Sequence, residues 1–402
     1  MKISFSPPYI TEEMIQEVAE VLRSGWITTG PKTAAFEAGL KEFTGAKEVQ
    51  ALNSATAGLE LALRWFGIGP GDEVIVPAYT YCASANVVLH CGATVVMADV
   101  GSDFNIDVSK LGELITPNTK AIIPVDFGGF PCDYPGISAL VVEHKAKFEA
   151  KGEQQEKLGR ILVLADAAHS LGAYTEKGKV GSLADFSAFS FHAVKNLTTA
   201  EGGGLAIHLP IAFDCEAVKK ELRKWALHGQ SKDALAKTKV GGWRYDVDFP
   251  GFKCNMTDIQ AAIGLIQLRE YPQILARRKE IFDRYANAFE HEIIPPYCTE
   301  KVSSSFHVFA LRLRGFSESK RDRLMEYCAE QDVAVNVHFQ PLPLLTAYRN
   351  LGFLISDVPE AFAMYANEIS LPVYYTMTEA EMDRVIEVVS AGVKALRDEK
   401  TA

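Results

Sequence analysis

The sequence has little of what marks a membrane-bound or secreted protein. No apolar run approaches the roughly 18 to 20 residues that a membrane-spanning helix needs. The first residues, Met1-Lys2-Ile3-Ser4, are not followed by the apolar core of a signal peptide. The seven cysteines are odd in number and include no C-x-x-C pair, which fits reduced thiols and not a disulfide framework or zinc knuckle. These absences predict a cytoplasmic protein with no membrane partner.

Patterns that bind metals or nucleic acids are also missing. The nine histidines form no H-E-x-x-H motif or comparable cluster, so no protein-bound metal is expected. The formal net charge is -10, whereas a nucleic-acid-binding protein normally presents a basic face. An anionic substrate would therefore have to be held by a few local groups.

What remains is the composition of an ordinary folded protein, with 48% hydrophobic and 23% charged residues. The 402 residues suit two domains better than one. Strand-like and helix-like segments alternate through the first half of the chain, which predicts an α/β fold with a mostly parallel sheet that binds ligands at the carboxyl ends of its strands. The expected strands are 48–52, 73–77, 94–100, 120–125, 161–166, 186–191 and 205–208.

Helical patterns flank this region. A helix capped by Thr11 should run to Arg23 and end at Gly25, with Met14, Val18, Val21 and Leu22 on its apolar face. The charged stretch 143–160 predicts a solvated helix and loop. Later segments predict helices over 257–268 and 272–289, and then a smaller unit with a strand at 307–314, a helix at 317–330, a strand at 333–337 and a last helix at 379–396.

A lysine follows one of the most apolar strands. The run from Phe186 to Phe191 breaks off at Lys195, and Glu201 and three glycines follow. Burial disfavours an ammonium, so this lysine needs a charge partner or a reason to be neutral. A Schiff base to pyridoxal phosphate supplies one, because the neutral amine is the nucleophile. The alternative is a lysine in a surface turn.

The glycines after Glu201 do not form a dinucleotide-binding fingerprint. They lack the G-x-G-x-x-G spacing and lead into a strand instead of a helix. We therefore reject nicotinamide binding on this stretch.

A carboxylate ends another apolar strand. Residues 161–165 lead into Asp166, and a carboxylate buried there is costly unless it meets a cation or hydrogen-bond donors. A protonated pyridine nitrogen is such a cation, and this pairing makes pyridoxal phosphate an electron sink. The alternative is an aspartate that caps the end of a core strand.

The segment Asn53-Ser54-Ala55-Thr56-Ala57-Gly58 joins a strand to a helix through small residues. Unpaired backbone N–H groups and the helix dipole point at such a turn, which makes it a candidate anion site. An ordinary capped turn remains the alternative.

Two motifs together resemble a known family. D-x-A-H at residues 166–169 is followed by S-F-H-x-x-K-x-x-T-T-x-E-G-G at residues 190–203. This combination resembles the DegT/DnrJ/EryC1/StrS family, the sugar-nucleotide aminotransferases of the aspartate-aminotransferase fold (fold type I). Further stretches match at residues 24–32, 53–58, 71–77 and 251–258. The form of the second motif is closest to the UDP-4-amino-4-deoxy-L-arabinose aminotransferase branch.

The resemblance implies a pyridoxal phosphate site. In it, Lys195 would bind the cofactor covalently and Asp166 would pair with the pyridine nitrogen. His169 would lie near the 3-oxygen of the ring, and Tyr81 would stack on the ring face. The implied fold has a large cofactor-binding domain with a seven-stranded sheet, here 1–260, and a linking helix with a small C-terminal domain, here 261–402.

The resemblance also implies phosphate and substrate contacts. Thr56, Ala57 and Ser190 would hold the cofactor phosphate, and Asn255 would reach it from the partner subunit of a homodimer with shared active sites. His338 matches a family histidine near the sugar substrate.

Three features depart from the family pattern. Asp126-Phe127-Gly128-Gly129 replaces a usual histidine–aromatic pair, which puts sugar recognition in doubt. The 143–160 stretch is longer than the usual connection, and Ala200 replaces the commoner glycine. Family members that dehydrate their substrate carry histidine in place of the lysine, so Lys195 favours transamination.

The sequence therefore predicts an aminotransferase that uses pyridoxal phosphate to move an amino group from L-glutamate to a nucleotide-linked keto sugar. C4 of a UDP-4-keto sugar for surface polysaccharide or lipopolysaccharide synthesis is the expected target. A transaminase of another keto sugar or of a keto-cyclitol is the rival, and a regulatory protein without enzymatic activity has no motif to support it.

Overall fold

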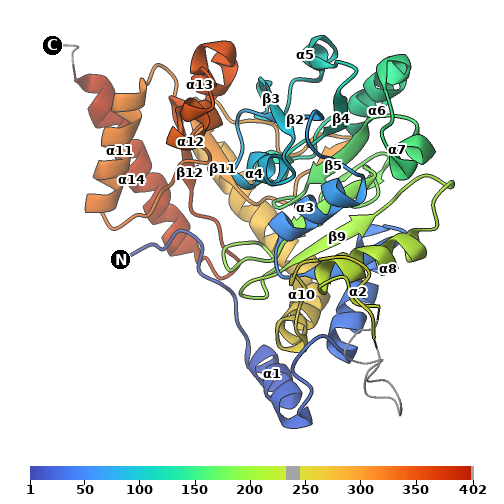
Figure 1. Ribbon diagram of the computed structural model, residues 1–402. Helices are drawn as coiled ribbons and strands as arrows, with labels where there is room; N and C mark the ends of the chain where they lie inside the picture. Colours follow the sequence, from blue (N-terminus) through green and yellow to red (C-terminus); the bar gives the residue numbers. More distant parts are fainter. Residues whose placement is uncertain (232–244, 400–402) are drawn as a thin grey trace.

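A seven-stranded sheet forms the centre of the computed structural model, which describes residues 1–231 and 245–399 (Figure 1). Its strands are β1 (Glu48–Leu52), β2 (Glu73–Pro77), β3 (Thr94–Ala98), β4 (Thr119–Ile122), β5 (Leu162–Asp166), β8 (Phe186–Ser190) and β9 (Gly203–Ile207). They lie in the order β1-β9-β8-β5-β4-β2-β3. Only β9 runs antiparallel to its neighbours, so the predicted mostly parallel sheet is confirmed.

Helices cover both faces of this sheet. They are α1 (Glu12–Ser24), α2 (Pro31–Thr44), α3 (Ala55–Trp65), α4 (Ala83–His90), α5 (Val108–Leu114), α6 (Tyr134–Glu143), α7 (Glu153–Leu158) and α8 (Cys215–Ala226), with short 3-10 turns η1 (Phe127–Gly129) and η2 (His144–Lys147). Neighbouring side chains of a strand point to opposite faces. Leu162 and Leu164 accordingly join the core under α3, α4 and α8, while Val163 and Ala165 join the core under α5 and α6.

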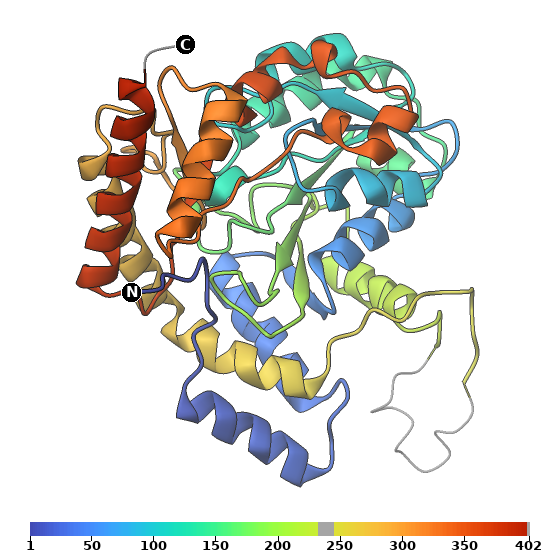
Figure 2. The same cartoon turned by 90° about the vertical axis from the view of Figure 1, so that its left-hand side faces the viewer.

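The N-terminal helix begins and ends where the sequence predicts. The Thr11 side chain accepts a hydrogen bond from the Met14 amide, and Gly25 adopts the left-handed conformation that closes the helix. Met14 and Val21 are buried, but Leu22 is 55% exposed, so its assignment to the apolar face was wrong. The helix packs on α10 (Asp258–Ala288) and lies at the edge of the molecule, away from the sheet (Figure 2).

One continuous helix, α10, replaces the two helical stretches expected around Pro272. A proline in a helix interior removes one hydrogen bond and strains the turn before it. Tyr271 and Ile274 are both buried on either side of the proline. Packing against α1 and α2 therefore holds the two stretches together.

The C-terminal part has its own hydrophobic core around a two-stranded antiparallel sheet. Its elements are β11 (Phe309–Arg312), α11 (Glu318–Glu330), η3 (Leu342–Leu344), α12 (Thr346–Asn350), η4 (Ile355–Asp357), α13 (Pro359–Tyr365), β12 (Glu368–Leu371) and α14 (Glu379–Asp398). A separate three-stranded sheet joins β6 (Tyr174–Thr175), β7 (Gly178–Lys179) and β10 (Val302–Ser303). The division of the chain after residue 260 stays a prediction.

The strand expected at 333–337 does not form. Val333 pairs with Ile3, and Asn336 pairs with Ser370 of β12 on another side. Because the backbone partners are split between two segments, no run of pairs develops. The same contacts bring the N-terminal segment into the C-terminal core, where Ile3 is buried.

The charged stretch behaves as predicted, with most side chains of 143–160 exposed. Gln155 is the exception, because its amide donates to the carbonyl of Phe66. Within residues 1–231 and 245–399, no helix combines the length and apolar character needed to cross a membrane.

Candidate active site

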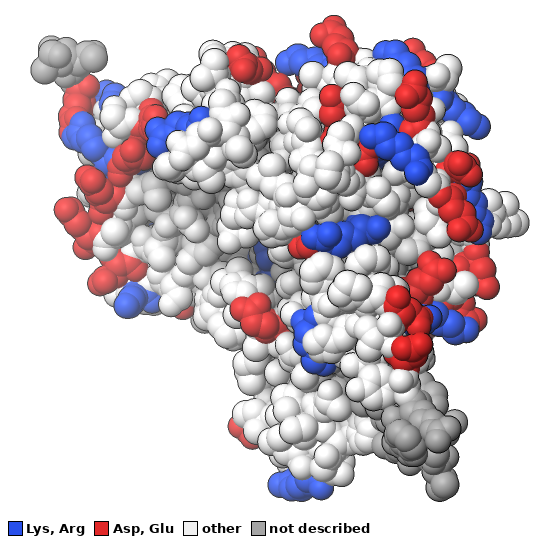
Figure 3. Space-filling model, viewed as in Figure 1, with Lys and Arg blue, Asp and Glu red and all other residues white. Residues whose placement is uncertain are grey.

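A cavity of about 490 Å³ opens at the carboxyl ends of β5 and β8. The N-terminus of α3 forms one side, and the C-terminal part contributes the opposite side through His307, His338 and Phe339. The face seen in Figure 3 is hollowed near its middle, and a basic side chain is visible inside the hollow. The cavity therefore lies where an α/β sheet is expected to bind a ligand.

Lys195 lies in the cavity wall after β8. Burial lowers the pKa of its amine to about 8, and the charge of Asp166 acts in the opposite direction with a smaller effect. Its backbone N–H donates to the carbonyl of His192, which closes the turn that presents the side chain. A substantial fraction of this amine is therefore neutral near pH 8, as a nucleophile or base requires.

Asp166 ends β5 and is only 6% exposed. Its Oδ2 accepts a 2.7 Å hydrogen bond from the Ser84 hydroxyl, and its Oδ1 accepts a 3.2 Å bond from the Ala168 amide. Burial raises the pKa of this carboxyl, although Ser84 and Ala168 partly offset the effect. The sequence did not single out Ser84, because a serine at the start of a helix carries no recognisable motif.

Neutral imidazoles surround the lysine. His169 is 8% exposed, its ring lies 4.4 Å from that of His307, and burial lowers the pKa of both well below the usual range. Its Nδ1 is buried without a hydrogen-bond partner among the described residues. His307, which sequence reasoning missed, bonds through Nδ1 to the side chain of Asn196 at 2.8 Å.

A buried arginine holds the backbone of the cavity wall that contains His307. Arg278 of α10 donates to the backbone carbonyls of Phe306, His307 and Val373 and has no carboxylate partner in the described part of the chain. Burial lowers the pKa of its guanidinium to about 10. The arginine thus ties the long helix to two strand ends that line the cavity.

The strand-to-helix turn at residues 53–58 forms the other end of the cavity. Ser54, Ala55 and Thr56 line it, whereas Ala57 does not, and the Ala57 amide donates to the Ser54 side chain at 3.1 Å. The first amides of a helix have no partner within the helix, so the turn offers donors to an anion. Among the predicted phosphate contacts, Thr56 and Ser190 face the cavity.

Gly203 allows the strand after the motif to pass this turn closely. A Cβ atom at this position would lie 2.2 Å from the carbonyl carbon of Ser54 and 2.4 Å from the Ala55 nitrogen. Any other residue would push β9 away from the turn. The close approach of two backbone segments therefore explains why this position of the E-G-G sequence is a glycine.

Tyr81, His338 and the N-terminal segment complete the cavity. Tyr81 is exposed in the wall, and its ring lies 6.0 Å from that of Phe339. His338 stacks on Phe5 at a centroid distance of 5.6 Å. Sequence reasoning gave Phe5 no role, because its place depends on the pairing of the N-terminus with the C-terminal core.

Asn255 does not line the cavity of its own chain. Its amide donates to the Thr29 hydroxyl at 2.7 Å, and its oxygen accepts from Lys253 at 2.5 Å. The carbonyl of the preceding Cys254 accepts a hydrogen bond from the amide of Asn53, the first residue of the strand-to-helix turn.

Asp126, the first departure from the family pattern, is fully buried behind the cavity. Its carboxylate accepts from the Cys132 amide, the Tyr134 hydroxyl and the Ser170 hydroxyl. Burial raises its pKa to about 6. It supports the segment that carries His169 and does not itself reach the cavity.

These groups fit pyridoxal phosphate. A buried carboxylate with few donors suits a protonated ring nitrogen, and the unpaired Nδ1 of His169 shows a polar demand that the described residues do not meet. Lys195 has the depressed pKa of a Schiff-base lysine, and the α3 turn offers donors to a phosphate.

Comparison with protein families and with known proteins agrees with this fit. Residues 8–390 match the model of the DegT/DnrJ/EryC1/StrS aminotransferase family. The spore coat polysaccharide biosynthesis protein SpsC of Bacillus subtilis is 38% identical over 399 residues, which cover 98% of this chain and 97% of that protein.

Solved structures are similar over the whole chain. Spr1654 of Streptococcus pneumoniae, assigned as a sugar aminotransferase and solved in its PMP form, superposes with a TM-score of 0.95 and 47% identity, covering 98% of this chain and 100% of that one. PseC of Helicobacter pylori, an aminotransferase involved in pseudoaminic acid biosynthesis, gives a TM-score of 0.86 at 28% identity, again over 98% and 100%.

Proposed function

The chain belongs to the DegT/DnrJ/EryC1/StrS aminotransferase family, and from that premise we propose that it transfers an amino group from L-glutamate to a nucleotide-linked keto sugar. Family membership makes it a pyridoxal-phosphate-dependent sugar aminotransferase. The amino donor, the nucleotide and the carbon that is aminated are parts of the proposal.

The observation that carries the proposal is the placement of Lys195 and Asp166 in one cavity. They come from neighbouring parallel strands, β5 and β8, and each affects the pKa of the other. Pyridoxal phosphate, when bound, supplies an electron sink for the carbon that loses a proton. Asp166 would keep the ring nitrogen protonated, and Lys195 would hold the cofactor.

Lys195 is also the group that moves the proton. Because burial lowers its pKa to about 8, the amine can accept a proton and return it near neutral pH. The histidines around it have pKa values well below that of the lysine and stay neutral. They therefore do not compete with it as bases for a proton.

The cofactor phosphate would bind at the α3 turn through Thr56, Ala57 and Ser190. Thr56 and Ser190 face the cavity, which supports their part of the proposal. Ala57 does not line the cavity, and its amide donates to the Ser54 side chain, so it would contribute by holding the turn in shape. Asn255 lies outside the cavity of its own chain, as a residue that acts on a partner's site would. We therefore propose a homodimer with shared active sites.

The proposed acceptor is the 4-keto group of a UDP-linked sugar, for surface polysaccharide synthesis in the cytoplasm. The relation to SpsC, a spore coat polysaccharide biosynthesis protein, supports polysaccharide synthesis as the role of this chain. His338 would contact the sugar from the C-terminal wall.

An absorption spectrum of the protein with added pyridoxal phosphate tests the cofactor, and a keto-sugar panel with glutamate tests the acceptor. Lys195→Ala should abolish transamination, because no other described group in the cavity can form the covalent bond or carry the proton. Lys220→Ala, on the exposed side of α8, is the matched control and should keep full activity. Borohydride labelling of another lysine would show that the assignment is wrong.

A further inference from the structure

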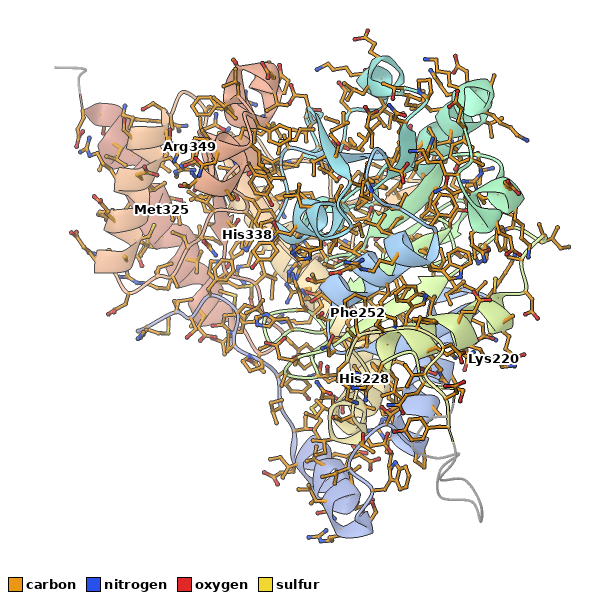
Figure 4. The ribbon with its side chains drawn as sticks, in the orientation of Figure 1. Lys220, His228, Phe252, Met325, His338 and Arg349 are labelled. Atoms are coloured by element: carbon orange, nitrogen blue, oxygen red, sulfur yellow. The ribbon has the colours of Figure 1, made fainter. Side chains whose placement is uncertain are left out.

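A chain of hydrogen bonds leads from a buried carboxyl group to the cavity wall. Glu368 of β12 is fully buried, and its Oε1 lies 2.5 Å from the Ser370 hydroxyl. The same hydroxyl lies 2.9 Å from Nδ1 of His338. His338 lines the cavity and lies between the C-terminal helices and the central sheet in the view of Figure 4.

The backbone of His338 fixes which carboxylate oxygen faces the serine. Its amide donates to Oε2 of Glu368 at 3.2 Å, and its carbonyl accepts from the Tyr79 hydroxyl at 2.7 Å. Oε2 is therefore held as an acceptor, and any proton on the carboxyl group belongs on Oε1. Stacking on Phe5 fixes the ring plane.

The two protonation states of Glu368 give opposite imidazole tautomers. When Glu368 carries a proton on Oε1, it donates to the Ser370 oxygen, and the Ser370 hydroxyl then donates to Nδ1 of His338. The imidazole proton must then lie on Nε2. Nε2 has no partner among the described residues and is not a buried unpaired atom, so it is open to the cavity.

When Glu368 loses its proton to water, the directions reverse. The Ser370 hydroxyl donates to the carboxylate, and its oxygen accepts from Nδ1–H. The imidazole proton has moved from Nε2 to Nδ1, so the cavity-facing nitrogen becomes an acceptor. One proton leaves the protein, and the imidazole is neutral in both states.

Two charged groups, from β11 and α11, lie around Glu368, together with the phenol of Tyr79. Arg312 of β11 lies opposite it in the strand register but bonds to Asn367 and Ala363, and Arg321 of α11 donates to backbone carbonyls, including that of Glu368. Burial raises the pKa of Glu368 to about 8, with Ser370, the His338 amide and Arg321 acting in the opposite direction. Tyr79 lies close enough for Glu368 to raise its pKa further.

Three titratable groups face His338 from the cavity side. They are Lys195, His169 and His307. Burial, and to a lesser extent the charge of Lys195, lower the pKa of His338 to about 4, so its ring is neutral whether Glu368 is protonated or not. The hydrogen-bonded chain Glu368–Ser370–His338 is called the relay below.

We propose that Glu368 and Ser370 are positioning residues that set the tautomer of His338, so that Nε2 donates a hydrogen bond to an oxygen of the keto sugar when Glu368 is protonated. The acceptor in this hydrogen bond is a carbonyl or hydroxyl oxygen of the sugar, and for that ligand the proposal rests on the proposed function. A neutral donor polarises such an oxygen without the desolvation cost of a second cation beside Lys195.

The direct test is the ¹⁵N spectrum of histidine side chains in the wild-type protein without substrate. Protonated and unprotonated imidazole nitrogens differ widely in shift, and His338→Asn identifies the signals. We expect Nε2 to be protonated at pH 6.5 and Nδ1 at pH 9.5, with a midpoint at about 8. A tautomer that stays the same across this range would overturn the proposal.

Glu368→Gln separates the relay from other titrations. The glutamine amide can donate to Ser370 and still accept from the His338 backbone, so Nε2 should stay protonated at every pH. Lys195 titrates in the same range but is retained in this variant. Glu318→Gln is the matched control, because Glu318 accepts from Tyr365 in the same part of the fold and should leave the transition unchanged. A transition that persists in Glu368→Gln would refute the relay.

Ser370→Ala provides an independent variant if Glu368→Gln does not fold. It removes the connecting hydroxyl, so the midpoint near pH 8 should vanish from the His338 signals. A retained transition would contradict the role of Ser370.

Kinetics distinguish this proposal from the proposed function. KM is measured at pH 7 and pH 9 with a keto sugar that the enzyme accepts, in the wild type and in Glu368→Gln. The ratio of the wild-type KM to the variant KM should rise about tenfold between these two pH values. The glutamate half-reaction should show no such difference between the two proteins. If no sugar is accepted but the tautomer change is present, the proposed function fails while the relay stands.

Discussion

The Ser84 hydroxyl donates a 2.7 Å hydrogen bond to the Asp166 carboxylate, joining the first turn of α4 to the end of β5. The same hydroxyl lies 2.9 Å from that of Thr80. The Ser84 bond lowers the pKa of the Asp166 carboxyl against the effect of burial, and the Thr80 contact helps to hold the Ser84 hydroxyl in place.

Ser84→Ala should therefore weaken catalysis without abolishing cofactor binding. Loss of a hydrogen bond to a charged group costs about 1.5 to 3 kcal/mol, so turnover should fall by roughly tenfold or more. Ser109→Ala, on exposed α5, is the control. Steady-state rates decide the matter, and an unchanged turnover would show that Asp166 does not depend on Ser84.

Asp166→Asn should have a larger effect, because it preserves shape but removes the charge that, on the proposed role of Asp166, would keep the ring nitrogen protonated. We expect the cofactor still to bind and turnover to drop by about three orders of magnitude. Cofactor absorbance and single-turnover rates measure the two effects separately. Turnover within a few-fold of the wild type would exclude this role.

Lys195→Met should stabilise the protein when the cofactor is absent. The folded-state pKa of Lys195 is about 8, below the ordinary 10.5, so the unfolded chain binds more protons between these values. Wild-type stability therefore rises with pH across this window, and the full penalty applies below pH 8. Urea unfolding at pH 7 should show a gain of about 1 to 2 kcal/mol for the variant.

The gain from Lys195→Met should shrink as pH approaches 10.5, because the unfolded chain then also loses its proton. An equal gain at pH 7 and pH 10.5 would assign the effect to packing instead of charge.

Mixed dimers test whether Asn255 acts across subunits. Lys195→Ala protomers lack the lysine, and Asn255→Asp protomers should bind the cofactor phosphate weakly. If the sites are shared, a mixed dimer holds one site with both native residues, and activity returns. If confirmed subunit exchange restores no activity, Asn255 acts in its own chain or outside the site.

The fold was largely predictable because each strand has an apolar run of its own. All seven expected strands of the central sheet are present, with ends displaced by a few residues at most. The expected strand at 333–337 failed because its partners lie in two distant segments, Ile3 and Ser370. Local pattern does not reveal how such partners are divided.

The candidate site was predictable where a residue follows a strand, as Asp166 and Lys195 do. Ser84 and His307 were missed because their contacts join positions far apart in the chain. The bond between Ser84 and Asp166 spans 82 residues, and that between His307 and Asn196 spans 111. Neither Ser84 nor His307 belongs to a sequence motif from which such a distant partner could be predicted.

Arg278 also limits how this enzyme can be redesigned. Because one guanidinium holds three carbonyls at two strand ends, the wall that carries His307 cannot be reshaped by local loop grafting without leaving a buried cation unpaired. Phe5 differs from Arg278 in this respect. It reaches the cavity from an N-terminal segment that few hydrogen bonds hold to the rest of the protein, so it can be changed with less disturbance. Libraries aimed at a new sugar acceptor should vary that position first and leave the arginine and its carbonyls untouched.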